Sequence, residues 1–234
     1  MGPGPEQATD APHGDSAQDL PAQLPSGRHG LPRRFVVANQ RKRILAAVAH
    51  VVADIGYPRA TVGEIVTAAR LSRRTFYEHF DGKEDCYLAT YDAAVERGWQ
   101  RVEAAQRGHE MWADQVRASL AAVIDMLVQD PELGRACLVE VVAAGLEALD
   151  RRNHTMKRFA AGLNERGQRH VPPGVEVPPI AAELVVGGLY EIISARLIAG
   201  RPETLYDELP QMTYCVLVPY CGHREASAAA ARMA

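Results

Sequence analysis

The chain has 234 residues, of which 47% are hydrophobic and 24% charged, and its net charge is -3. This length suits one large domain or two small ones, and the composition excludes wholesale disorder, coiled-coil and collagen-like proteins. The charge is uneven: residues 1–27 hold four acids and no Lys or Arg, whereas residues 28–83 hold eleven Lys or Arg against four acids. Residues 84–234 are acidic, so a basic block precedes a larger acidic one, which predicts that one end of the protein meets a polyanion.

Membrane, secretory and metal-binding features are not found in the sequence. A membrane helix needs about 18 uninterrupted apolar residues, and the best candidate, 180–199, contains Glu183, Glu191 and Arg196. The first 27 residues lack the basic and apolar segments of a secretory signal. The four cysteines show no C-x-x-C pair and no metal-ligand spacing: Cys86, Cys137, Cys215 and Cys221. We therefore expect a cytoplasmic protein with reduced thiols and without a metal, a cofactor or a membrane segment.

The first expected helices follow a tail. Residues 1–32 are rich in Pro, Gly, Ala, Gln and Asp without periodicity, which predicts a disordered tail. Apolar residues then repeat at helical spacing from Ile44 to Ile55, and Gly56 ends that helix. A second helix starts behind Thr61, where Glu64 completes a capping box.

The remaining expected elements are also helices. Ser72 caps a short third helix, with Phe76 and Phe80 one turn apart, and Asp81 opens a fourth that runs to about Gln106. Apolar residues from Trp112 to Leu127 mark a fifth, and further helices fit about 131–144, 145–168, 179–199 and 204–220. No alternating strand pattern is found, so the predicted class is all-α. The predicted divisions are a tail at 1–32, a DNA-binding domain at 33–83, a ligand-binding and dimerisation domain at 84–222, and a C-terminal tail at 223–234.

The most informative stretch runs from Ile44 to Glu84. Two helices joined by the short Ala69-Arg70-Leu71 turn predict a helix-turn-helix, whose second helix can enter the major groove of DNA. Phe76 and Phe80 face the core in this arrangement. The other side of the helix carries Arg73 and Arg74, which can read guanine, and Thr75, which can contact a thymine methyl. Donors suited to phosphate are Tyr77, His79, Lys83 and the backbone amides behind Thr61 and Ser72.

The same stretch resembles the DNA-binding domain of tetracycline-repressor (TetR) family regulators. The resemblance lies in Ile44-Leu45-Ala46-Ala47, Gly56-Tyr57, Thr61-Val62, Glu64-Ile65, the run Leu71–Phe80 with its Thr-Phe-Tyr-x-His-Phe core, and Lys83-Glu84. It covers about 45 residues, and the long helical remainder is consistent with the family's ligand-binding domain. The resemblance implies DNA contacts from Thr61, Arg73, Thr75, Tyr77, His79 and Lys83. Helical position adds Arg74, and the amides at the helix start add Ser72.

One position departs from the family. The turn usually contains Gly where this chain has Arg70, and a left-handed residue other than Gly costs about 1 kcal/mol or more. Either the turn avoids positive φ or Arg70 accepts the strain. Shortly before the first predicted core residue lie Arg33, Arg34, Arg41, Lys42 and Arg43. They form either an arm along the minor groove or a solubilising linker with ordinary helix-start residues. Arg41 and Arg43 are the better candidates for phosphate contacts.

The last two expected helices are strongly apolar. From Ile180 to Leu197 the sequence is apolar almost all round, which predicts a helix that is buried or lies in an interface, and Gly187-Gly188 suggests a close backbone approach. The resemblance implies that these two helices pair with their twins in a homodimer, with interface residues Leu184, Gly187, Gly188, Ile192 and Leu217. An ordinary monomer core is the alternative.

A ligand pocket would lie among the middle helices. Large or adaptable apolar candidates for its lining are Trp99, Trp112, Met126, Met156, Phe159 and Tyr190, with Glu140, Asn153 and His154 as polar ones, although each also fits plain core or surface. Nucleophile-elbow, Walker, zinc-protease and Rossmann motifs are missing, and Ala113 stands where the second His of His109-Glu110-x-x-His would be.

The expected function is a homodimeric, ligand-responsive transcriptional repressor that binds a palindromic DNA operator and is released by a small-molecule effector. Two alternatives remain open at this point. One is an all-α enzyme or small-molecule carrier with a structural helix-turn-helix, and the other is an effector-independent DNA-binding or architectural protein.

Overall fold

The computed structural model describes residues 32–232, and each regular element in that range is a helix. The all-α prediction is therefore confirmed. The expected N-terminal tail lies, except for residue 32, outside the described residues. The chain divides into two units between Arg43 and Ile44. Among the described helices, none is long and apolar enough to cross a membrane.

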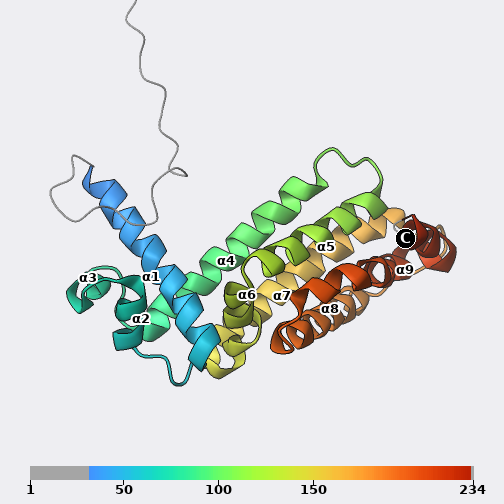
Figure 1. Ribbon diagram of the computed structural model, residues 1–234. Coiled ribbons are helices and arrows are strands. Elements are labelled where there is room, and N and C mark those ends of the chain that lie inside the picture. Colours follow the sequence, from blue (N-terminus) through green and yellow to red (C-terminus); the bar gives the residue numbers. More distant parts are fainter. Residues whose placement is uncertain (1–31, 233–234) are drawn as a thin grey trace, which may run out of the picture. The chain divides into compact units, whose positions relative to one another are not determined.

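Three helices open the described chain: α1 (Arg33–Ile55), α2 (Val62–Ala69) and α3 (Arg73–Tyr77) (Figure 1). Helix α1 already begins at Arg33, so the basic residues 33–43 are helical rather than an extended arm or linker. The predicted capping box is present at the start of α2: the Glu64 amide donates to Thr61 Oγ1 at 3.3 Å, and the Thr61 amide donates to Glu64 Oε2 at 2.8 Å. Ser72 caps α3, also as predicted.

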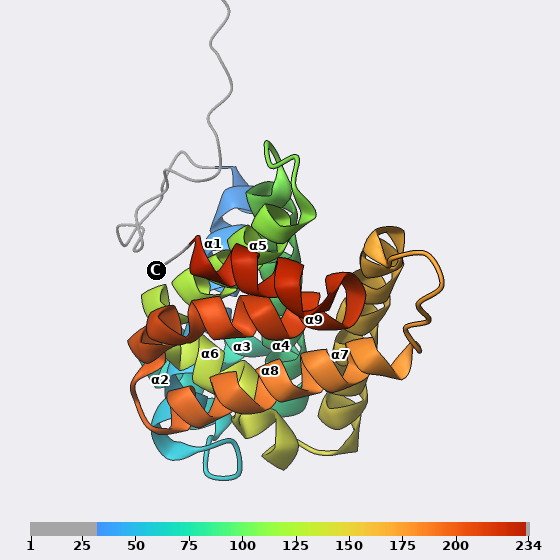
Figure 2. The ribbon, with the colours of Figure 1, turned by 90° about the vertical axis from the view of Figure 1, so that its right-hand side faces the viewer.

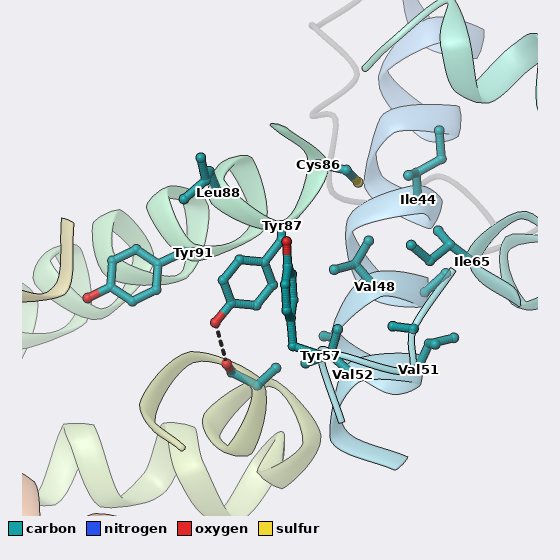
Figure 3. Packing of buried hydrophobic residues seen from close by; sticks show 14 of the residues in the cluster. Ile44, Val48, Val51, Val52, Tyr57, Ile65, Cys86, Tyr87, Leu88 and Tyr91 are labelled. Carbon is teal, nitrogen blue, oxygen red and sulfur yellow. Dashed lines mark hydrogen bonds between the residues drawn. The ribbon is translucent and has the colours of Figure 1, made fainter. Parts of the chain in front are cut away.

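The core beneath the helix-turn-helix extends beyond it. Ile44, Val48 and Val52 of α1 pack with Ile65 of α2 and are fully buried (Figure 3). The same cluster includes residues of α4 (Lys83–Gln106) and α6 (Pro131–Leu138): Cys86, Tyr87, Leu88, Tyr91, Ala94, Leu133, Ala136 and Cys137. The position expected as a domain boundary, 83/84, therefore lies within a continuous core. Helix α4 starts at Lys83 behind Gly82, two residues later than Asp81.

The other helices are α5 (Trp112–Gln129), α7 (Leu146–Gly167), α8 (Ile180–Ile198) and α9 (Leu205–Ala231), with short 3-10 turns η1 (Glu140–Ala143), η2 (Gln168–His170) and η3 (Pro202–Thr204). Helix α5 packs against α4 and α9, whereas α8 packs against α6, α7 and α9. The single helix expected over 131–144 is wrong, because α6 ends at Leu138 and η1 follows.

The predicted C-terminal tail at 223–234 is also wrong for its described part. Residues 223–231 are the last turns of α9, which bends at Gly222 (φ 76°, ψ 170°), as Figure 2 shows. Ala226 and Ala229 are buried in a cluster with Trp112, Leu217 and Tyr220. An alanine-rich segment has high helix propensity, and its small side chains pack closely, so it stays helical.

Candidate nucleic-acid interface

Helix α3 has one buried and one exposed side. Phe76 is fully buried and Phe80 is 3% exposed, and their rings lie 5.8 Å apart beneath the helix. The Thr75 amide donates to Ser72 Oγ at 3.0 Å, which satisfies one of the free donors at the helix start. Arg73 and Arg74 are exposed, and Tyr77 is 56% exposed despite its large ring. The helix thus presents two cations and a phenol to solvent from a rigid apolar base.

The turn before α3 contains the strain that Gly would avoid. Arg70 adopts a left-handed conformation (φ 52°, ψ 48°), so the second of the two alternatives is realised. Its amide donates to the carbonyl of Thr67 at 3.1 Å, and the Leu71 amide donates to that of Val66 at 3.0 Å. These bonds close the end of α2 and hold the turn. The exposed Arg70 therefore adds positive charge where a Gly would add none.

Arg73 and Thr61 both lie close to Gly63 at the start of α2. A β-carbon placed on Gly63 would lie 3.2 Å from Arg73 Nη2 and 3.5 Å from Thr61 Oγ1. The absence of a side chain at Gly63 therefore leaves room for the Arg73 guanidinium over the N-terminus of α2. A guanidinium, a hydroxyl and helix-start amides are groups that bind phosphate. The structure thus brings together two residues predicted separately as DNA contacts.

Arg74 and Lys83 differ in how they are held. Arg74 Nε lies 3.3 Å from Glu78 Oε1, but the Arg74 side chain is 90% exposed, so water and salt weaken this pair. Lys83 Nζ donates to the carbonyl of Tyr57 at 3.0 Å and lies 4.2 Å above the Tyr57 ring. Lys83 therefore has a structural role that the sequence did not predict. Its contact with DNA stays a prediction, as do those of Thr75 and His79, which are half-buried, and of Arg41 and Arg43 in α1.

Two comparisons of sequence support this interpretation of the geometry. Residues 44–90 match the family model described as bacterial regulatory proteins, tetR family. This part of the chain is therefore similar to the DNA-binding domain of tetR-family regulators. It is 29% identical over 118 residues to the HTH-type transcriptional activator FasR of Mycolicibacterium smegmatis, a match that spans 50% of this chain and 54% of FasR. The match thus spans only about half the length of that relative.

Solved structures of bacterial regulators share the fold of about three quarters of the chain. The fatty acid degradation regulator FadR of Bacillus halodurans superposes with a TM-score of 0.67 at 19% identity, over 75% of this chain and 97% of that one. FadR of Bacillus subtilis, solved in complex with stearoyl-CoA, gives 0.64 at 19% identity, over 77% and 98%. The N-terminal helix-turn-helix and the larger helical C-terminal domain are therefore those of the TetR fold.

The α8–α9 face is apolar and exposed. Leu184 is 70% exposed and Ile192 is 38% exposed, although α8 was expected to have no wet side. With Gly188 they line a groove of about 540 Å³ between α8 and α9, which Arg196 and Glu208 also line. Figure 2 shows these two helices side by side. The close backbone approach expected at Gly187-Gly188 is not found among residues 32–232, since a β-carbon at either would meet no atom within 4 Å beyond its chain neighbours and the local backbone of α8.

Leu217 does not belong to this face. Its side chain is fully buried with Trp112, Val216 and Tyr220, so a second chain could not contact it. The prediction of Leu217 as an interface residue is therefore wrong. Leu217 points inward from α9, whereas Cys215 of the same helix lines the groove.

The six predicted pocket residues fall into separate clusters. Trp99 of α4 lies 5.1 Å from Phe159 of α7, and Met126 of α5 approaches the neighbouring Gly98. Trp112 instead stacks on His170 at 4.6 Å and meets Tyr220 edge-on at 5.6 Å. A single pocket that includes Trp112 is not what the structure shows. Met156 is half-buried, whereas the polar candidates Asn153 and His154 are exposed on α7.

Tyr190 connects three helices. Its hydroxyl donates to the carbonyl of Leu138 at 2.5 Å, and the Arg152 guanidinium lies 4.3 Å from its ring. Nearby, burial raises the pKa of Tyr91 to about 12, and burial raises that of the Cys137 thiol to about 12. Both groups are therefore neutral near pH 7, and Cys137 is a core residue rather than a reactive thiol.

Proposed function

We propose that the protein is a transcriptional repressor that binds a palindromic operator as a homodimer and leaves it when a small-molecule effector binds. Each subunit places α3 in a major groove, where Arg73, Arg74 and Tyr77 contact DNA. The observation that carries this proposal is the two-sided α3, with Phe76 and Phe80 buried and the cations exposed.

The dimer of the proposal uses the α8–α9 face. Exposed Leu184 and Ile192 form an apolar surface around a groove, and covering apolar area contributes about 25 cal/mol for each Å² removed from water. A two-fold axis through this face would give two α3 helices related by the symmetry of a palindrome. Arg196 and Glu208, which form an ion pair at 2.5 Å, also line this groove.

The effector of the proposal has a long apolar part. The middle helices α4, α5 and α7 bring Trp99, Phe159 and Met126 into one region, and such side chains line sites for apolar ligands. FadR of Bacillus subtilis was solved with stearoyl-CoA, which makes this thioester the first effector to test. Operator affinity should fall at least about tenfold with stearoyl-CoA and stay unchanged with coenzyme A alone, since a coupling of 1–3 kcal/mol is typical. Equal affinity with and without stearoyl-CoA would overturn the acyl thioester class.

Fluorescence anisotropy tests the DNA-binding part of the proposal. The probes are a duplex from upstream of the protein's own gene and a shuffled duplex of equal composition, titrated at several salt concentrations. We expect tight binding to the first duplex, weak binding to the second, and a steep loss of affinity with salt. No binding to any duplex at any salt would contradict the proposal and return the enzyme or carrier alternative.

Repression itself needs a transcription measurement, because FasR is an activator. A reporter under the upstream region should be more active in cells that lack the protein than in cells that contain it. Lower activity without the protein would make it an activator with the same DNA-binding site.

A further inference from the structure

Segment α6–η1, residues 131–143, makes polar contacts with the helix-turn-helix and with α4. Glu132 lies 3.0 Å from His50 Nδ1 of α1, the Tyr87 hydroxyl of α4 donates to the carbonyl of Ala136 at 2.8 Å, and Glu140 accepts the Tyr57 amide at 3.0 Å. The first pair is about half exposed, so solvent screens it. The Glu140 side chain is only 15% exposed, and it reaches the loop that leads into α2.

Tyr57 is held from several directions. Glu140 accepts from its amide, Lys83 donates to its carbonyl at 3.0 Å, and its ring lies between Lys83 at 4.2 Å and Tyr87 at 4.9 Å. Figure 3 shows Tyr57 against Tyr87 and the hydrogen bond from Tyr87 to the α6 backbone. Both backbone polar groups of Tyr57 are therefore satisfied by charged side chains, which form stronger hydrogen bonds than neutral ones.

Gly56 makes the contact with Glu140 possible. Its φ of +80° is a conformation that other residues rarely adopt, and it turns the chain so that the Tyr57 amide faces η1. A β-carbon at Gly56 would lie 3.3 Å from Glu140 Oε2. Arg135 Nη2, 3.9 Å from Glu140 Oε1, helps to orient the carboxylate from the preceding helix.

The same segment is also connected to helices α7 and α8. The Leu138 carbonyl, two residues before Glu140, accepts from the Tyr190 hydroxyl of α8 at 2.5 Å. The Tyr190 ring in turn lies beneath Arg152 of α7 at 4.3 Å. A displacement of α7 or α8 therefore acts on the backbone next to Glu140.

We propose that Glu140 is a positioning residue that couples segment α6–η1 to helices α2 and α3, through its hydrogen bond to the Tyr57 amide. Only residues 58–60 separate Tyr57 from the Thr61 cap, and Pro58 stiffens that stretch, so a shift of η1 is passed to the start of α2. Arg73 lies over that same start, at Gly63, so the shift reaches a predicted DNA contact. This inference rests on the proposed function, because the coupled output is DNA binding.

Hydrogen exchange of the full chain tests the contact first. In Glu140→Ala, amides of residues 57–69 should exchange about tenfold faster than in wild type, while those of α5 stay unchanged. Glu140→Gln keeps an acceptor oxygen and should restore most of the protection. Glu132→Ala, which removes a carboxylate from the same segment, should leave residues 57–69 as they are. Wild-type exchange of residues 57–69 in Glu140→Ala would overturn the proposal.

Operator DNA then tests the coupling. Because coupling is reciprocal, duplex DNA that binds the wild type should slow exchange in residues 131–143, and this effect should be lost in Glu140→Ala at saturating DNA. Equal protection in both proteins would overturn the coupling role. Absence of any DNA binding by wild type, seen by anisotropy, would instead be a failure of the proposed function.

If Glu140→Ala does not fold, NMR measurements on the wild-type protein test the proposal instead. The Tyr57 amide proton should be protected from exchange, and operator DNA should shift its resonance together with those of residues 131–143. A Tyr57 amide that exchanges as fast as an open loop, or that DNA shifts alone, would overturn the inference.

Discussion

The α3 surface and the α8–α9 surface differ in what holds them and in what they expose. Helix α3 exposes Arg73, Arg74 and Tyr77 from a base of two buried Phe side chains. Helix α8 exposes Leu184 and Ile192 beside an open groove. Exposed cations on a short rigid helix suit a polyanion, whereas a contiguous apolar face suits a protein surface. We therefore expect DNA at the α3 surface and a second protein chain at the α8–α9 surface.

The first prediction concerns the buried Phe side chains beneath α3. Phe76→Ala should lower the free energy of unfolding by about 3–5 kcal/mol, because a fully buried ring is replaced by a cavity. Urea denaturation measures the loss, and Tyr77→Ala is the control, with an expected change within about 0.5 kcal/mol because Tyr77 is exposed. A loss below about 1 kcal/mol for Phe76→Ala would contradict the described packing.

The second prediction concerns base recognition at the same surface. Arg74→Ala should cost about 1–3 kcal/mol on the operator and much less on shuffled DNA, because a bidentate base contact is lost while phosphate contacts remain. Anisotropy with both duplexes measures the difference. Equal losses on the two duplexes would make Arg74 a phosphate contact, and unchanged binding would remove it from the site.

The third prediction concerns a charge placed on the apolar α8–α9 surface. Leu184→Asp should raise the dissociation constant of the dimer at least about tenfold, because a charge would be buried in the interface. Sedimentation analysis over a range of concentrations measures it. Leu146→Asp is the matched control, since Leu146 is 86% exposed at the start of α7 and does not line the groove. A Leu184→Asp dimer as tight as wild type would place the interface elsewhere.

The fourth prediction separates stability from binding on the α3 side. Gly63→Ala should stabilise the protein by about 0.5–1 kcal/mol, because Ala has the higher helix propensity. The new methyl group lies where Arg73 Nη2 now approaches, so the guanidinium must move and operator affinity should fall. Thermal unfolding and anisotropy on one preparation check both effects. Unchanged affinity would show that the position of Arg73 does not matter for binding.

The smallest expected effect is a pH dependence of the core. Burial raises the pKa values of Tyr91 and Cys137 to about 12, so the folded state favours their neutral forms. Their contribution to stability is complete below the unfolded pKa values, about 9 for Cys and 10 for Tyr, and is lost as pH rises toward 12. Urea midpoints should therefore fall steadily above about pH 9. A constant or rising midpoint would contradict the burial of these groups.

Local chemistry explains what the sequence predicted well. The capping box of Thr61 and Glu64, the Ser72 cap and the buried Phe76–Phe80 pair each depend on residues a few positions apart, and the structure confirms all of them. For the backbone conformation of Arg70 the sequence leaves two alternatives, because the φ angle at one turn depends on how the flanking helices pack. The left-handed conformation is a result of that packing.

Contacts between distant parts of the chain could not be predicted in the same way. Glu140 and Tyr57 are 83 positions apart, and no pattern at either residue indicates the other. The apolar periodicity of α9 identified Leu217 as apolar, but it could not tell an inward side chain from an outward one, because both sides of α9 meet apolar surfaces. Likewise, the sequence identifies Trp99 and Trp112 as large apolar residues, but it does not show that they lie in different clusters.

The central claim is that two copies of α3 read two related half-sites on DNA. Selection of binding sequences from a pool of random duplexes with the full chain, followed by sequencing, tests it most directly. We expect an enriched palindrome whose half-site centres lie about 10 base pairs, or a multiple of that, apart, and Arg74→Ala should relax the base preference within each half-site. A pool that shows no enrichment, or a single asymmetric half-site, would contradict recognition of two related half-sites.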